Sequence, residues 1–248
     1  MQPIWFSYRF GFELEGFVSD VGWGCMHRTG QMLLAKCLQM LGHSDKEIIP
    51  LFYDNLTQQY SIQQIVRMAG KYSKGPGEWL NPTTLALVLQ DLVSHFKVVV
   101  ATNSCLATSQ ISDYPILILL PLRLGIESLN QKYFSLICDF IDHPNSVGIV
   151  GGKQNSSLYF TRRKDSTFYY LDPHTNQDIA TENDFSSYYT HELTMPVELI
   201  DPSILVGFLC FSLEQSQELC EFLRKTEVVE VCEQISEYES LEEFEVFE

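Results

Sequence analysis

The stretch Trp23-Gly24-Cys25-Met26-His27-Arg28 predicts a helix that begins on a cysteine. Glycines flank the tryptophan, so the backbone can turn sharply just before Cys25. Apolar residues then recur at helical spacing as far as Leu41, and Gly42 is a typical helix stop. The amino end of a helix favours an anion, so the pKa of a cysteine thiol at this position is lowered and its thiolate forms more readily. Cys25 is therefore a candidate nucleophile, although most free cysteines are simply small buried apolar residues.

A second motif, Tyr170-Leu171-Asp172-Pro173-His174, lies far downstream. Residues 166–171 are β-branched and aromatic, which predicts a strand. Asp172 and His174 are two residues apart, so an extended chain places both on one face. His174 is a candidate general base and Asp172 a candidate group to orient it. Alone, the motif is also ordinary turn chemistry, but with Cys25 it completes a set for thiol-based acyl transfer.

The composition limits the possible functions. The 248 residues are 45% hydrophobic, enough for one substantial core. The net charge is −16, which disfavours binding to nucleic acid or to an anionic bilayer. The longest apolar run, residues 116–122, is far shorter than the roughly 20 residues of a membrane span. We therefore expect no nucleic-acid partner, and membrane contact only peripherally, through a lipidated substrate.

Seven cysteines, an odd number without a Cys-x-x-Cys pair, argue against a disulfide framework and a zinc site. This composition fits a reducing cytoplasm, and we expect a monomer that needs neither a metal nor another cofactor.

The predicted fold class is α+β, with one domain over residues 1–226 that includes a small helical subdomain within about 43–96. Residues 227–248 carry nine glutamates and no Lys or Arg, which predicts a flexible acidic tail. Predicted helices cover residues 25–41, 82–95 and 128–141, and others are capped at Ser44, Ser61 and Ser212. Predicted strands cover residues 97–101, 116–120, 147–150, 157–162, 167–171 and 204–211.

Many short blocks resemble one family, the autophagins, which are the autophagy-related protein 4 cysteine proteases. The blocks keep the family order and cover residues 4 to about 225. They are Phe6-Ser7-Tyr8-Arg9, Ser19-Asp20-Val21-Gly22-Trp23-Gly24-Cys25-Met26, Gly30-Gln31-Met32, Ile118-Leu119-Leu120-Pro121-Leu122-Arg123-Leu124-Gly125, Gly148-Ile149-Val150-Gly151-Gly152-Lys153, Asn155-Ser156, Tyr159-Phe160, Leu171-Asp172-Pro173-His174 and Asp201-Pro202-Ser203.

The resemblance implies a papain-like fold, in which the helix bearing the nucleophile packs against an antiparallel sheet bearing the Asp-Pro-His motif. It implies that Cys25 is the nucleophile, His174 the base and Asp172 the acid that orients it. It also implies that Tyr8 donates a hydrogen bond to the oxyanion. A further group would gate the substrate groove, with an aromatic lid and the mobile loop opposite it: Trp79, Lys153, Gln154, Asn155 and Ser156.

The acidic tail contains two short aromatic patterns. Tyr238 with Leu241, and Phe244 with Phe247, resemble peptides that add a strand to autophagy-related protein 8 modifiers. A solvated tail with incidental aromatic residues is the alternative.

The family resemblance implies a cytoplasmic cysteine protease that cleaves a ubiquitin-like autophagy modifier of the autophagy-related protein 8 type. It would cut after the modifier's C-terminal glycine, both to process the precursor and to release the modifier from phosphatidylethanolamine. Three alternatives stay open. They are a protease for a different ubiquitin-like protein, a modifier-binding module with vestigial catalysis, and an acyltransferase with the same thiol chemistry.

Overall fold

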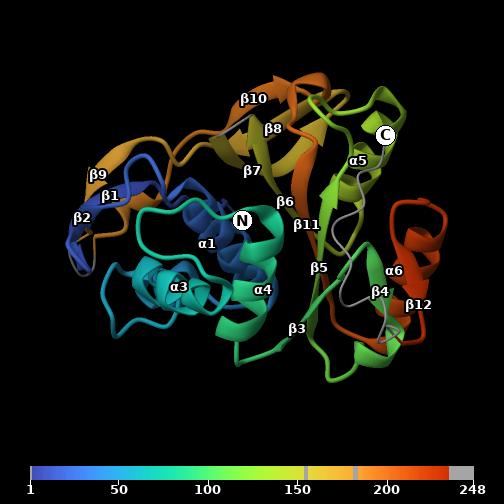
Figure 1. The fold of residues 1–248 in the computed structure, drawn as a ribbon, viewed down its shortest axis with the longest axis horizontal. Coiled ribbons are helices and arrows are strands. Elements are labelled where there is room, and N and C mark those ends of the chain that lie inside the picture. The colour runs from blue at the N-terminus through green and yellow to red at the C-terminus, as the bar shows by residue number, and fades with distance from the viewer. Residues whose placement is uncertain (1, 154–155, 181–183, 235–248) are drawn as a thin grey trace.

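The computed structural model describes residues 2–153, 156–180 and 184–234, and its centre is one mixed sheet (Figure 1). Neighbouring strands pair antiparallel except β3 and β5, which pair in parallel. The α+β prediction is confirmed, while the parallel edge was not predicted. The strand order is β10 (Leu193–Pro196), β8 (Thr167–Leu171), β7 (Ser156–Lys164), β6 (Ser146–Lys153), β11 (Ser203–Cys210), β5 (Ile116–Arg123) and β3 (Lys97–Val100).

Helices cover both faces of this sheet. Figure 1 shows α1 (Cys25–Met40), α3 (Ile62–Ala69) and α4 (Pro82–Leu92) on one side, and α5 (Phe134–Asp142) and α6 (Leu213–Arg224) on the other. Successive side chains of a strand point to opposite faces. In β5, Leu117 and Leu119 therefore join the core under α1, whereas Ile118 and Leu120 join the core under α5 and α6. A strand buried on both faces reads as a continuous apolar run.

The helix α1 begins and ends where the glycines predict. Gly24 is its N-cap, and a Cβ there would lie only 2.4 Å from the Asp20 carboxylate. Gly42 has a φ of +93°, a left-handed conformation that glycine adopts easily and that ends helices. The helix packs against β6 and β7, so the buried start of α1 faces the strands that lead to the Asp-Pro-His motif.

Side-chain caps set the starts of the other helices. Ser61 and Ser212 each accept a hydrogen bond from the backbone N–H three residues later, at the starts of α3 and α6. The short helix α2 (Asp45–Ile48) has the predicted capping box, in which the Ser44 N–H donates to Glu47 at 2.8 Å. These helices from α2 to α4 share one core with α1.

Two of the predicted helix bounds were wrong. The helix predicted over 82–95 ends at Leu92, and α5 starts at Phe134 rather than 128, after a single 3-10 turn.

A small second sheet was not predicted, and it positions part of the site. Its strands are β2 (Phe17–Ser19), β1 (Tyr8–Leu14) and β9 (Asn176–Asp178), in that order. Tyr8 pairs in parallel with Asn176, and its N–H donates to the Pro173 carbonyl at 2.8 Å. The amino-terminal strand is thereby tied to the segment that carries His174.

The tail boundary predicted at residue 226 was wrong. Strand β12 (Glu230–Cys232) pairs in parallel with β4 (Cys105–Ala107), and Val228 and Val229 are buried in the core under α6. The many glutamates around this short apolar stretch made it look like part of the acidic tail. Its burial holds residues 228–232 against the domain. A disulfide joins Cys105 to Cys232, a pair that the argument against a disulfide framework did not predict.

The tail residues Tyr238, Leu241, Phe244 and Phe247 lie outside the described residues. Within the described ranges, none of the helices has the length and apolar character needed to cross a membrane.

Candidate active site

Cys25 is the first residue of α1 and is almost fully buried. Burial alone would raise the pKa of its thiol. Hydrogen bonds from His174, from the Ser157 backbone N–H and from Tyr8 outweigh burial, so the pKa of Cys25 lies below its ordinary value. A lowered pKa at a helix start favours the thiolate, which is the nucleophilic form of cysteine.

His174 lies between Cys25 and Asp172. Its Nδ1 is 2.5 Å from Asp172 Oδ1, and its backbone N–H donates to the same oxygen at 3.0 Å. The hydrogen bonds to Asp172 and then to Cys25 raise the pKa of His174 to about 9. Burial would raise the pKa of Asp172, but the same contacts with His174 lower it overall. The structure thus brings the three predicted residues together, and their contacts favour the charged form of each.

Asp172 and His174 are held from the amino-terminal side. The indole N–H of Trp5 donates to the Asp172 carbonyl at 2.8 Å. The ring of Tyr8 lies edge-on to that of His174, with centroids 5.3 Å apart. The Tyr8 hydroxyl hydrogen-bonds the Cys25 sulfur, and burial beside that sulfur raises the pKa of Tyr8. Tyr8 therefore keeps its proton and remains a hydrogen-bond donor to the Cys25 sulfur.

A buried ion-pair network holds the turn before Cys25, and no sequence pattern indicated it. Arg28 lies one turn into α1, and its guanidinium is 2.7 Å from Asp20 and 2.8 Å from Asp54. Burial would lower the pKa of Arg28, but these two carboxylates raise it. The Asp20 carbonyl also accepts the N–H groups of Trp23 and Gly24. Because Asp20 binds both the turn and the helix, the network fixes the position of Cys25 at the start of α1.

His27 follows Cys25 by two residues on α1 and packs in the interior. It is fully buried against Trp23, with ring centroids 5.2 Å apart. Burial lowers the pKa of His27 to about 3, so it stays neutral. His174, and not His27, therefore provides the imidazole that hydrogen-bonds Cys25.

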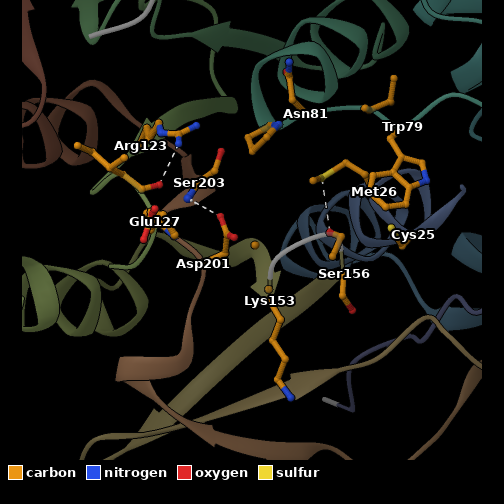
Figure 2. Close-up of a pocket in the computed structure, with 17 residues that line it drawn as sticks. Cys25, Met26, Trp79, Asn81, Arg123, Glu127, Lys153, Ser156, Asp201 and Ser203 are labelled. Carbon is orange, nitrogen blue, oxygen red and sulfur yellow. Dashed lines mark hydrogen bonds between the residues drawn. The ribbon is translucent and has the colours of Figure 1, made fainter. Parts of the chain in front are cut away.

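A cavity of about 780 Å³ opens beside Cys25. Trp79 borders it, is 46% exposed, and donates its indole N–H to the Gly22 carbonyl at 2.7 Å. The indole is therefore tied to the same turn that precedes the nucleophile. Figure 2 shows the lining side chains, which surround Cys25 at one end and reach the far end of the cavity: Trp79, Met26, Ser156, Lys153, Arg123, Glu127, Asp201 and Ser203.

The predicted gating loop is described only in part. Lys153 ends β6 and Ser156 begins β7, and both line the cavity on the side opposite Trp79 (Figure 2). The Ser156 hydroxyl is 3.4 Å from His174 Nε2. Gln154 and Asn155 lie outside the described residues. Among the residues that are described, no group of three or more His, Cys, Asp or Glu is arranged to hold a metal ion.

Comparison with known proteins gives consistent matches. Residues 1–222 match the Peptidase C54 catalytic domain. Cysteine protease ATG4 of Candida albicans is 34% identical over 227 residues, which cover 82% of this chain and 51% of that protein. Probable cysteine protease atg4 of Schizosaccharomyces pombe is 36% identical over 222 residues, covering 83% and 69%. Cysteine protease ATG4B of Xenopus laevis is 32% identical over 280 residues, covering 90% and 73%.

The chain spans about half the length of the Candida albicans relative. The matched segment includes Cys25 at the start of α1, the Asp-Pro-His motif and the sheet between them. With its papain-like α+β arrangement and its match over residues 1–222, the chain belongs to the Peptidase C54 family.

Proposed function

We propose that this chain is a cysteine protease that cleaves a ubiquitin-like autophagy modifier after a glycine near its carboxyl end. One observation carries the proposal: the thiol of Cys25 borders an open cavity, and the imidazole of His174 links that thiol to the carboxylate of Asp172. The names of the relatives, which are cysteine proteases ATG4, support the same class of reaction.

In the acylation step, the Cys25 thiolate attacks the glycine carbonyl carbon. A tetrahedral intermediate with a negatively charged oxygen forms, and Tyr8 and the Cys25 backbone N–H would donate hydrogen bonds to that oxygen. The imidazolium of His174 then gives its proton to the leaving amine as the C–N bond breaks. Asp172 keeps His174 in the orientation in which Nε2 faces the sulfur.

In the deacylation step, His174 is neutral and acts as the base. It removes a proton from a water molecule, whose oxygen attacks the thioester carbonyl. The C–S bond breaks and the Cys25 thiolate returns beside an imidazolium. The same cycle serves two substrates, because the leaving amine is a peptide nitrogen in a precursor and the ethanolamine nitrogen in a lipid conjugate.

Trp79 supports selection for glycine. Its indole borders one side of the cavity beside Cys25, and Lys153 and Ser156 border the other. A narrow passage between them would exclude a Cβ at the residue whose carbonyl is attacked. We therefore propose Trp79 as a gate and the modifier's C-terminal segment as its occupant. Such a partner places the reaction in the cytoplasm, with membrane contact only through a lipidated substrate.

The test is cleavage of a purified modifier precursor that carries extra residues after its glycine. The unmutated protein should release one product that ends in glycine, as read by intact mass. Cys25→Ser and His174→Ala should abolish cleavage, and Asp172→Ala should lower it strongly.

Two variants serve as matched controls. Cys138 is a free, half-buried cysteine and His43 an exposed histidine, both outside the cavity lining. Cys138→Ser and His43→Ala should therefore cleave normally. Tight binding of the modifier by the unmutated protein without any cleavage would instead indicate a binding module.

A further inference from the structure

Two buried hydroxyl groups connect the nucleophile helix to the sheet. Thr29, on α1, and Ser157, on β7, are both almost completely buried. Their oxygen atoms are 2.8 Å apart, although the two residues are 128 positions apart in the sequence. This bridge lies one helical turn after Cys25, where α1 packs on β7.

The protons of the bridge can be assigned from its other partners. Each hydroxyl has one proton to donate. Thr29 Oγ1 is 3.1 Å from the carbonyl oxygens of both Cys25 and Met26, which can only accept. Thr29 therefore donates to the helix backbone and accepts from Ser157. The other acceptor near Ser157 is the Met26 sulfur at 3.5 Å, and a thioether is a weak acceptor.

The bridge reaches the nucleophile from two directions. Through Thr29 it binds the carbonyl of Cys25, and through Ser157 it holds the strand residue whose backbone N–H donates to the Cys25 sulfur. A shift of β7 relative to α1 would lengthen that second contact. The hydroxyl bridge opposes such a shift because it joins the same two elements at the same level.

We propose that Thr29 and Ser157 are a pair of positioning residues that hold the Ser157 N–H against the sulfur of Cys25. Thr29 does not line the cavity beside Cys25, whereas Ser157 does, and the role proposed here for both is through the bridge. Their role rests on the proposed thiol chemistry, and it sets how readily the thiol ionises. Losing the bridge should therefore raise the pH at which Cys25 becomes reactive.

The test measures the thiol directly, without a protein substrate. Iodoacetamide alkylates the peptide containing Cys25, and mass spectrometry gives its rate at a series of pH values. Thr29→Val keeps the side-chain shape and removes the hydroxyl. We expect its midpoint to move to higher pH and its rate below the midpoint to fall on the order of three- to tenfold, the effect of one positioned hydrogen bond.

Two further variants make the result specific. Ser157→Ala removes the other hydroxyl and should shift the midpoint by the same amount, whether or not Thr29→Val folds well. The double variant should be no worse than either single one, because the two groups act as one bridge. Thr29→Ser keeps a hydroxyl and should restore most of the unmutated profile.

Ser216→Ala is a matched control. Ser216 is also a buried helix hydroxyl, bonded to a carbonyl three residues earlier at 2.8 Å and to the Tyr114 hydroxyl at 2.5 Å, but it lies on α6. Its loss should leave the alkylation profile unchanged. Unshifted profiles in both Thr29→Val and Ser157→Ala, or an equal shift in Ser216→Ala, would overturn the proposal. Failure of the proposed protease function would show separately, as normal alkylation without precursor cleavage.

Discussion

Replacing Asp172 with Asn tests whether a carboxylate keeps His174 charged. Asparagine preserves the shape and can still accept a hydrogen bond, so the substitution removes mainly the negative charge. The hydrogen bond to Asp172 is the largest cause that raises the pKa of His174 from 6.5 to about 9, the hydrogen bond to Cys25 comes next, and the negative charge of Asp172 adds to both. An opposite charge in contact typically changes a pKa by about 1 to 3 units. Since both side chains are partly open to solvent, we expect the pKa of His174 to fall by at least about one unit.

The direction of the change can be followed at both partners. Without Asp172, the imidazolium of His174 loses its proton at a lower pH. The pKa of Cys25 should then rise, because the positive charge that favours its thiolate is weakened. The pH range in which the Cys25 thiolate and the His174 imidazolium coexist therefore becomes narrower at both its lower and its upper limit. Cleavage at neutral pH should fall by on the order of 10²- to 10⁴-fold, the usual contribution of a positioned acid or base.

Titration of the His174 ring by NMR measures this prediction. The signal is assigned by its absence in His174→Gln. Asp142→Asn is the control, since Asp142 also forms an ion pair, with Arg163, but outside the site. An unchanged His174 titration in Asp172→Asn would refute the argument that Asp172 sets the charge of the base.

Three other predictions concern the pH profile, the turn before α1 and the gate. The rate of cleavage should rise with pH as Cys25 ionises. It should fall as pH increases through about 9, because His174 then lacks the proton that the leaving amine needs. A profile of kcat/KM against pH measures both changes. Asp54→Ala should lower the free energy of unfolding by about 3 kcal/mol in urea titration, since it leaves the buried Arg28 with one carboxylate fewer. Trp79→Ala should change turnover and let an alanine replace the substrate glycine; identical kinetics on both substrates would reject the gate.

Local sequence patterns predicted much of the fold. Capping residues at Ser61 and Ser212 and the glycines around α1 act within a few residues, so their effects can be read from the chain. The run over 116–120 was correctly predicted as a buried strand because apolar residues fill both faces of β5. In each case, the signal and the structure it specifies lie in the same short segment.

Long-range pairing accounts for what the sequence did not reveal. Strand β1 was not predicted, and one of its two partners, β9, lies far along the chain. The pairing of Glu230–Cys232 with β4 was hidden by the surrounding glutamates, and only its burial shows that this segment belongs to the domain.

The candidate site also combines residues that local motifs predicted with contacts that depend on long-range packing. Cys25, Asp172 and His174 stand in recognisable local motifs, and the structure brings them together as predicted. The ion pair of Asp20 with Arg28, and the Thr29–Ser157 bridge, have no such motif. Each depends on how α1 meets another segment, which spacing alone does not specify.

The central claim is that the Cys25 thiolate attacks the carbonyl carbon of a modifier's C-terminal glycine. The most direct measurement uses a modifier in which an alkyne electrophile replaces the group after that glycine. After incubation, intact mass gives the stoichiometry and peptide mapping gives the labelled residue. The account predicts one modifier per chain, attached at Cys25, slowed in His174→Ala and absent in Cys25→Ser. Attachment at another cysteine, or no adduct while Cys25 still reacts with iodoacetamide, would contradict it.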